Sequence, residues 1–129
     1  MNLSNNVTTS TATGVVNFLD SEHVRYITGG LTIDRTTVTE DSSGYRYLKG
    51  GTIVCEITAT KKYGPFDAGA TDGRQTAAIG KCFIIPKEVD CTFQDAQSGG
   101  IDMARVLTAR LPIQPTTEIK AALPLVTWN

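Results

Sequence analysis

The sequence predicts a mainly β fold of the α+β class: a small antiparallel β-rich domain with one short C-terminal helix and a flexible N-terminal arm. Three observations lead to this prediction. Short apolar runs alternate with Gly, Pro and Asp turn signals, one late segment carries helix signals, and residues 1–19 contain no charged side chain. A chain of 129 residues suffices for one core. We therefore expect an arm over residues 1–19 and a single domain over residues 20–129.

The arm is polar but uncharged, since nine of its first thirteen residues are Asn, Ser or Thr. So few apolar groups cannot offset a backbone ordering entropy of about 1–2 kcal/mol per residue, so we expect the arm to be mobile in the free protein. Thr8–Thr13 is rich in β-branched residues and lacks proline, which suits addition as a strand to the sheet edge of a partner. The alternative is a terminus without a role.

The first half of the domain contains two predicted strand regions. Leu31–Glu40 alternates imperfectly and is followed by a turn signal at residues 41–44, which predicts a hairpin into Tyr45 and Tyr47. Residues 53–59 alternate more clearly and predict a half-buried antiparallel strand that ends before Lys61.

The second half contains three more predicted strands. Ala77–Ile85 is the first, and its part from Lys81 is apolar on both faces, which places it inside the sheet. Pairing stops at Pro86 and resumes over Val89–Phe93. After a turn at residues 98–100, alternation predicts a strand that runs to Pro112.

A short helix and a closing strand end the predicted domain. Thr116 is a candidate N-cap, Glu118 falls in the first turn, and the helix must stop before Pro124. A helix of two turns is unstable alone, so its apolar side chains must pack on the sheet. Leu125–Trp128 is the predicted closing strand, in which Trp128 is either a lid on the core or an anchor between subunits.

Glycine, proline and aspartate are concentrated in the central segment, Tyr63–Gly80. Asp72-Gly73 is a dipeptide that type I′ hairpin turns favour. The block Thr71–Ala77 together with Gly80, preceded by a Gly-Pro-aromatic-Asp loop, resembles the lambda-type head decoration proteins of tailed bacteriophages. The resemblance covers roughly residues 50–90, and residues 20–49 are extra length relative to that family.

The resemblance implies a β-tulip-like fold and a structural role on the outer surface of the capsid. Decoration proteins of this family bind the expanded head as homotrimers at three-fold and local three-fold sites and stabilise it against internal DNA pressure. The implied partners are the major capsid protein of the same phage and two further copies of this chain. The resemblance also implies that the protein is in the host cytoplasm during assembly. The alternative is a small β-domain of a phage tail or fibre that binds another virion component or a host surface.

Two groups of candidate contact residues follow. In the arm they are apolar or β-branched residues suited to an added strand: Leu3, Val7, Thr8, Thr9, Thr11 and Val15. In the central segment they shape the loop at the trimer or capsid face: Tyr63, Pro65, Phe66, Asp72, Gly73 and Arg74. Ordinary loop architecture is the alternative for this second group.

Charge and hydropathy disfavour two classes of partner. Twelve Lys and Arg balance thirteen Asp and Glu, giving a net charge of −1 without a basic patch, so we expect no nucleic-acid partner. The sequence has neither an apolar window of 18 residues nor a signal-peptide pattern, so we expect no membrane partner and no secretion.

Catalytic and metal motifs are missing from the sequence, which predicts that the protein is not an enzyme and takes no cofactor. His23 is the sole histidine, and no nucleophile elbow is present. Asp67 and Asp72 lack the spacing of a calcium loop and are interpreted as turn-stabilising carboxylates.

The sequence has three cysteines, at positions 55, 82 and 91, without C-x-x-C spacing. Their apolar surroundings predict buried, reduced thiols. A disulfide between Cys82 and Cys91 is the alternative.

Overall fold

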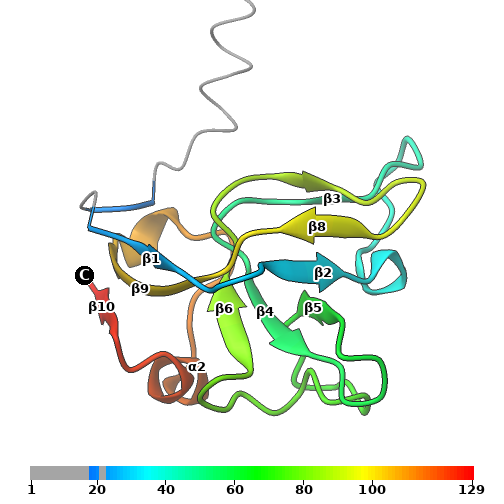
Figure 1. Cartoon of the computed structure of the whole chain (residues 1–129). Helices are drawn as coiled ribbons and strands as arrows, with labels where there is room; N and C mark the ends of the chain where they lie inside the picture. The colour runs from blue at the N-terminus through cyan, green and yellow to red at the C-terminus, as the bar shows by residue number, and fades with distance from the viewer. Residues whose placement is uncertain (1–17, 21–22) are drawn as a thin grey trace, which may run out of the picture.

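The computed structural model describes residues 18–20 and 23–129, and it confirms a small, mainly β domain (Figure 1). The first strands are β1 (Arg25–Tyr26), β2 (Leu31–Ile33), β3 (Tyr47–Leu48), β4 (Ile53–Glu56) and β5 (Tyr63–Pro65). The remaining strands are β6 (Cys82–Ile84), β7 (Val89–Asp90), β8 (Ala96–Ser98), β9 (Ile101–Val106) and β10 (Val126–Trp128). Two 3-10 helices, η1 (Arg35–Thr37) and η2 (Thr108–Arg110), and one α-helix, α2 (Thr117–Ala122), complete the described part.

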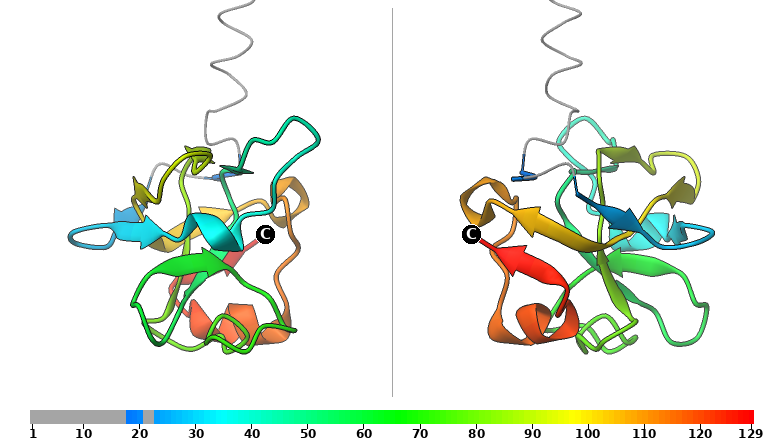
Figure 2. Two further views of the ribbon diagram at one scale, coloured as in Figure 1. Left: turned by 90° about the vertical axis from the view of Figure 1, so that its right-hand side faces the viewer. Right: turned by 60° about the vertical axis from the view of Figure 1, so that its left-hand side comes forward.

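Most strands belong to one curled sheet with the order β1-β9-β6-β4-β5-β2-β8, and β10 joins it alongside β9 (Figures 1 and 2). A separate small sheet pairs β3 with β7. Pairing is antiparallel except between β2 and β5 and between β10 and β9. The β9–β10 pair is parallel because the chain leaves β9, passes through η2 and α2, and returns in the same direction, as a crossover connection requires.

The two faces of the central strands pack into different core clusters. Ile53 and Cys55 belong to the first cluster, whereas Val54 between them belongs to the second. On β6, Cys82 and Ile84 alternate with Phe83 in the same way. The prediction that the segment from Lys81 lies inside the sheet is therefore confirmed, whereas β4 is buried on both faces rather than half-buried.

Helix α2 has the predicted start, end and buried side. The Thr116 side chain accepts a hydrogen bond from the Ile119 amide at 3.3 Å, as an N-cap does. Ile119, Ala122 and Leu123 are almost fully buried in the first core cluster. Trp128 on β10 packs against the same cluster, which supports its interpretation as a lid on the core.

The predicted hairpin between Leu31–Glu40 and Tyr47 is wrong. Strand β2 ends at Ile33, because Asp34 turns the chain into η1 by accepting a hydrogen bond from the Thr36 amide at 3.0 Å. β2 pairs with β5 and β8, and β3 pairs with β7. The turn at residues 41–44 is present, since the Asp41 carboxylate accepts hydrogen bonds from the Ser43 and Tyr45 amides.

The predicted strands are longer than the observed ones. Strand β4 ends at Glu56 and not at residue 59, and β7 covers only Val89–Asp90 of the predicted Val89–Phe93. The strand predicted from Ala77 begins only at Cys82, because residues 78–81 form a turn closed by a hydrogen bond from the Lys81 amide to the Ala78 carbonyl. Beyond β9 the chain turns into η2, so the strand does not reach Pro112.

Candidate functional site

The point where the N-terminal segment enters the domain is a buried anchor, which we call the arm root (residues 18–20). The Phe18 side chain is 2% exposed and belongs to the first core cluster. A methyl group added at Gly51 would lie 3.1 Å from both Phe18 Cδ1 and Pro112 Cδ, so the ring is closely packed. Phe18 was expected in the arm, but it lies in the core and fixes the chain at that position.

Backbone and side-chain contacts hold the arm root against β9 and the connection after it. The Leu107 amide donates to the Phe18 carbonyl at 2.7 Å, and the Asp20 amide donates to the Arg105 carbonyl at 2.8 Å. Leu19 forms an antiparallel bridge with Val106 between them. Residues 18–20 therefore lie along the edge of β9 that β1 also uses.

The Asp20 side chain reinforces this attachment. Its carboxylate accepts a hydrogen bond from Asn129 Nδ2 at 2.9 Å and lies 3.5 Å from an Arg105 guanidinium nitrogen. The N-terminal segment and the last residue, Asn129, are thus tied together beside β9. All six predicted arm residues, Leu3, Val7, Thr8, Thr9, Thr11 and Val15, lie outside the described residues.

The central segment begins with three residues that contact the sheet or the core. The Tyr63 ring lies 5.9 Å from the Phe83 ring, centroid to centroid, and Pro65 pairs with Val54 across β5 and β4. The Phe66 amide donates to the Ile53 carbonyl at 2.9 Å, and its side chain packs against the first core cluster. These three predicted site residues, Tyr63, Pro65 and Phe66, attach the loop to the sheet.

Asp72 and Arg74 fold the middle of the loop onto the end of β4. The Asp72 carboxylate accepts hydrogen bonds from the Arg74 amide at 3.1 Å and from Arg74 Nε at 3.1–3.2 Å. The Asp72 carbonyl accepts from the Thr58 amide at 2.9 Å, and Arg74 Nη1 donates to the Pro65 carbonyl at 3.3 Å. Desolvation raises the pKa of Asp72, but the Arg74 hydrogen bonds and charge outweigh it and lower the pKa overall.

Gly73 is required by both backbone conformation and space. Its φ is +117°, and a Cβ there would lie 2.5 Å from Thr58 Oγ1 and 2.9 Å from the Glu56 carbonyl oxygen. The predicted type I′ turn is wrong, because that turn needs a positive φ at both central residues and the φ of Asp72 is not positive. Among the described non-glycine residues, Lys61 alone has a positive φ, 62°, in the turn that joins β4 to β5.

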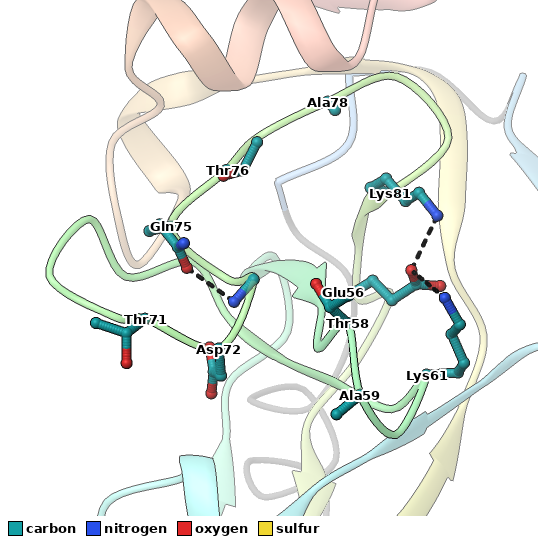
Figure 3. Close-up of a pocket in the computed structure, with 11 residues that line it drawn as sticks. Glu56, Thr58, Ala59, Lys61, Thr71, Asp72, Gln75, Thr76, Ala78 and Lys81 are labelled. Atoms are coloured by element: carbon teal, nitrogen blue, oxygen red, sulfur yellow. Dashed lines mark hydrogen bonds and ion pairs between the residues drawn. The ribbon is translucent and has the colours of Figure 1, made fainter.

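An open hollow of about 610 Å³ lies beside this turn (Figure 3). Small uncharged side chains form much of its lining: Thr58, Ala59, Thr71, Thr76 and Ala78. At one side Glu56 accepts a hydrogen bond from Lys81 at 2.9 Å and pairs with Lys61 at 3.8 Å. The hollow therefore offers mainly hydroxyl and methyl groups, with the charged side chains of Glu56, Lys61 and Lys81 paired at one side.

Several exposed apolar or aromatic side chains, among them Ile79, Tyr45, Tyr47 and Phe93, were not among the predicted site residues. Ile79 is 71% exposed at the end of the central segment, where a strand was expected. Tyr45 and Tyr47 stack with ring centroids 5.6 Å apart, and Phe93, after β7, is 87% exposed. Aromatic residues two positions apart directly after a turn were the available signal for the tyrosines, whereas nothing in the sequence distinguishes Phe93 from a core residue.

Asp67 is the second carboxylate of the central segment that was predicted to stabilise a turn. The Asp67 carboxylate accepts a hydrogen bond from the Gly69 amide at 2.9 Å, so both Asp67 and Asp72 stabilise turns as predicted.

Within residues 18–20 and 23–129, no group of three or more His, Cys, Asp or Glu side chains is arranged to hold a metal ion. In the same residues, no helix has the length and hydropathy to cross a membrane.

The three cysteines are buried free thiols, as predicted.

Comparison of the chain with protein-family models, curated proteins and solved structures found no match. The arm root and the exposed surfaces of the domain therefore provide the basis for a functional proposal.

Proposed function

We propose that this chain is a phage capsid decoration protein that binds the expanded head as trimers at three-fold and local three-fold sites. One observation carries the proposal: an uncharged N-terminal segment joins a β-rich domain at a residue, Phe18, that is buried in the core. The resemblance of the Thr71–Ala77 block to head decoration proteins supports it, and so does the mainly β fold.

The arm root suits a protein that must withstand force. Tension on residues 1–17 would act first on Phe18, whose ring is enclosed by the core. It would then act on the two backbone hydrogen bonds to Arg105 and Leu107, which lie on the longest strand of the sheet and directly after it. Load on the arm is therefore shared with the sheet before any part of the chain can detach.

The arm supplies the main capsid contact in this proposal. Residues 8–13 add as a strand to an exposed sheet edge of the major capsid protein, where backbone hydrogen bonds give affinity and alternate side chains fill pockets. Three linked copies then gain an avidity of about 10²–10⁴ over one copy, without new contacts. Binding depends on head expansion if the receiving edge exists only in the mature lattice.

The central segment provides a second surface in this proposal. The residues on its inward side hold the loop to β4. The contact with the capsid is therefore made by its outward side, which comprises the hollow beside Thr71 and Thr76 and the exposed side chain of Ile79. Asp72, Gly73 and Arg74 act indirectly, by keeping that surface in shape.

The test is co-sedimentation of the purified protein with expanded heads and, separately, with unexpanded procapsids of its own phage. We expect saturable binding to expanded heads alone, in multiples of three per local three-fold site. Deleting residues 1–15 should leave the thermal unfolding midpoint unchanged and weaken binding by at least tenfold. The matched control replaces the arm valines, Val7 and Val15, by threonine, which keeps β-branching and should bind more tightly than the deletion variant.

Unchanged binding of the deletion variant would refute the role of the arm. If the full chain binds neither expanded heads nor procapsids, the decoration proposal fails. The tail or fibre alternative would then be pursued through the exposed rings of Tyr45, Tyr47 and Phe93, which offer apolar contact area to a partner.

A further inference from the structure

Two of the three cysteines lie directly opposite each other in the middle of the main sheet. Cys55 on β4 and Cys82 on β6 are register partners. On either side of them, the Glu56 amide bonds to the Lys81 carbonyl and the Ile85 amide bonds to the Thr52 carbonyl. Hydrogen-bonded pairs alternate with non-hydrogen-bonded pairs in an antiparallel ladder, so the cysteines occupy a non-hydrogen-bonded position, where opposing side chains are closest.

This position meets the spacing that a disulfide needs. Opposed residues in non-hydrogen-bonded pairs have Cα atoms about 4.5 Å apart, within the range of about 4.4–6.8 Å for disulfides. Both side chains point to the same face of the sheet and belong to the first core cluster. Cys91 belongs to the second cluster, on the opposite face, and is therefore separated from the pair by the sheet.

The two thiols are hydrogen-bonded to each other. The hydrogen bond from the Cys55 thiol and a further one from the Ala78 amide lower the pKa of Cys82, although burial opposes them. The same pairing with Cys82, together with burial, raises the pKa of Cys55. Burial opposes ionisation of both thiols, so access from solvent decides which of them reacts first.

Cys82 also has a route to solvent. It is 1% exposed, but it lines a hollow of about 170 Å³ together with Arg25, Gly80 and Leu125. Ile79, which is 71% exposed, lines the same hollow. A low-molecular-weight reagent that enters this hollow reaches Cys82 before Cys55, because Cys55 does not line it.

We propose that Cys55 and Cys82 are a modification site that closes to a cross-strand disulfide when the folded protein meets a low-molecular-weight disulfide. The Cys82 thiolate attacks one sulfur of the reagent, whose S–S bond breaks and releases one thiol. Cys55 then loses its proton and attacks the Cys82 sulfur, which releases the second thiol. Two protein thiols are oxidised and one reagent disulfide is reduced to two thiols.

The bond links the two central strands across the loop that contains residues 56–81. It therefore holds the central segment in place even when the rest of the domain opens. If the proposed function is correct, the bond forms after the particle leaves a reducing cytoplasm. The reaction of the two cysteines with a disulfide reagent does not depend on that function. Closing a loop of this length should raise the unfolding midpoint on the order of 10 °C.

The test exposes the folded full chain to hydroxyethyl disulfide and measures its intact mass, with unreduced peptide mapping to locate the bond. We expect the loss of two hydrogen atoms and one crosslinked peptide pair containing Cys55 and Cys82. Cys82→Ser should prevent closure, Cys55→Ser should stop at a mixed disulfide on Cys82, and Cys91→Ser should close like the wild type.

Retention of both thiols in the folded wild type, a persistent reagent adduct, or a crosslink to Cys91 would each overturn the proposal. Mapping of the wild-type chain gives this answer even if a serine variant does not fold. Because the assay needs no capsid, a failed closure leaves the decoration proposal intact, and failed capsid binding leaves the disulfide intact.

Discussion

Replacing Phe18 by alanine should destabilise the whole domain, although the residue lies at the edge of a segment expected to be an arm. The ring is 2% exposed, belongs to the first core cluster and lies close to Gly51, so truncation removes a fully buried aromatic group and leaves a cavity. Phe→Ala changes at such sites cost about 3–5 kcal/mol. For a domain of this size, that corresponds to a fall of on the order of 10–20 °C in the thermal unfolding midpoint.

Phe93→Ala is the matched control, because it makes the same chemical change at a side chain that is 87% exposed. It should change the free energy of unfolding by less than about 0.5 kcal/mol. Both variants are compared with the wild type by thermal and urea unfolding followed by circular dichroism. A Phe18→Ala midpoint within error of the Phe93→Ala midpoint would refute the placement of Phe18 in the core, and with it the arm root.

Two further predictions concern the central loop and the loss of stability at acid pH. Gly73→Ala should lower the free energy of unfolding by about 2–4 kcal/mol, because the added Cβ would meet the Thr58 side chain. Gly80→Ala is the control: its φ is +83° but the space around it is open, so the change should cost only about 1 kcal/mol. Equal losses for the two variants in urea unfolding would contradict the contact between residue 73 and Thr58. The Lys62 hydrogen bond and a backbone amide lower the pKa of Asp95, so its stabilisation is present above about pH 4 and is lost as the pH falls through the lowered pKa. Asp95→Asn should therefore be less stable at pH 7 and should lose less stability as the pH falls below about 4. An unchanged slope of stability against pH would count against this role.

Local signals in the sequence were reliable where a few neighbouring residues decide the structure. The N-cap of α2 was predictable because Thr116 and Ile119 are three residues apart and satisfy each other. The turn at residues 41–44 was predictable because Asp41 bonds to amides two and four positions ahead. Burial of the segment from Lys81 was predictable because both of its faces are apolar.

Strand partners and strand ends could not be predicted in the same way. β2 pairs with β8, more than sixty residues later, and a local pattern contains no information about that partner. The strand expected from Ala77 starts five residues late, because apolar composition does not reveal the turn closed between Ala78 and Lys81. A tertiary bond, from the Thr58 amide to the Asp72 carbonyl, likewise shapes the central turn that the Asp-Gly dipeptide alone suggested was type I′.

The candidate site was likewise predictable only in part. Tyr63, Pro65 and Phe66 were chosen as loop residues, and the structure gives them partners on β4 and β6 that a loop pattern cannot predict. The outward residues of the same segment are small or, like Ile79, apolar in a context that predicted a strand. Sequence patterns thus located the segment but assigned its inward and outward sides incompletely.

The arm root connects the two halves of the functional proposal. If the arm binds the capsid, any residue that carries its load must resist being pulled out, and a side chain in the core resists better than one on the surface. Phe18 meets this condition, while its neighbours Leu19 and Asp20 connect it to β9 through backbone pairing. Removal of residues 1–15 and truncation of Phe18 should therefore have separate effects: the first weakens binding at constant stability, and the second lowers stability before binding can be measured.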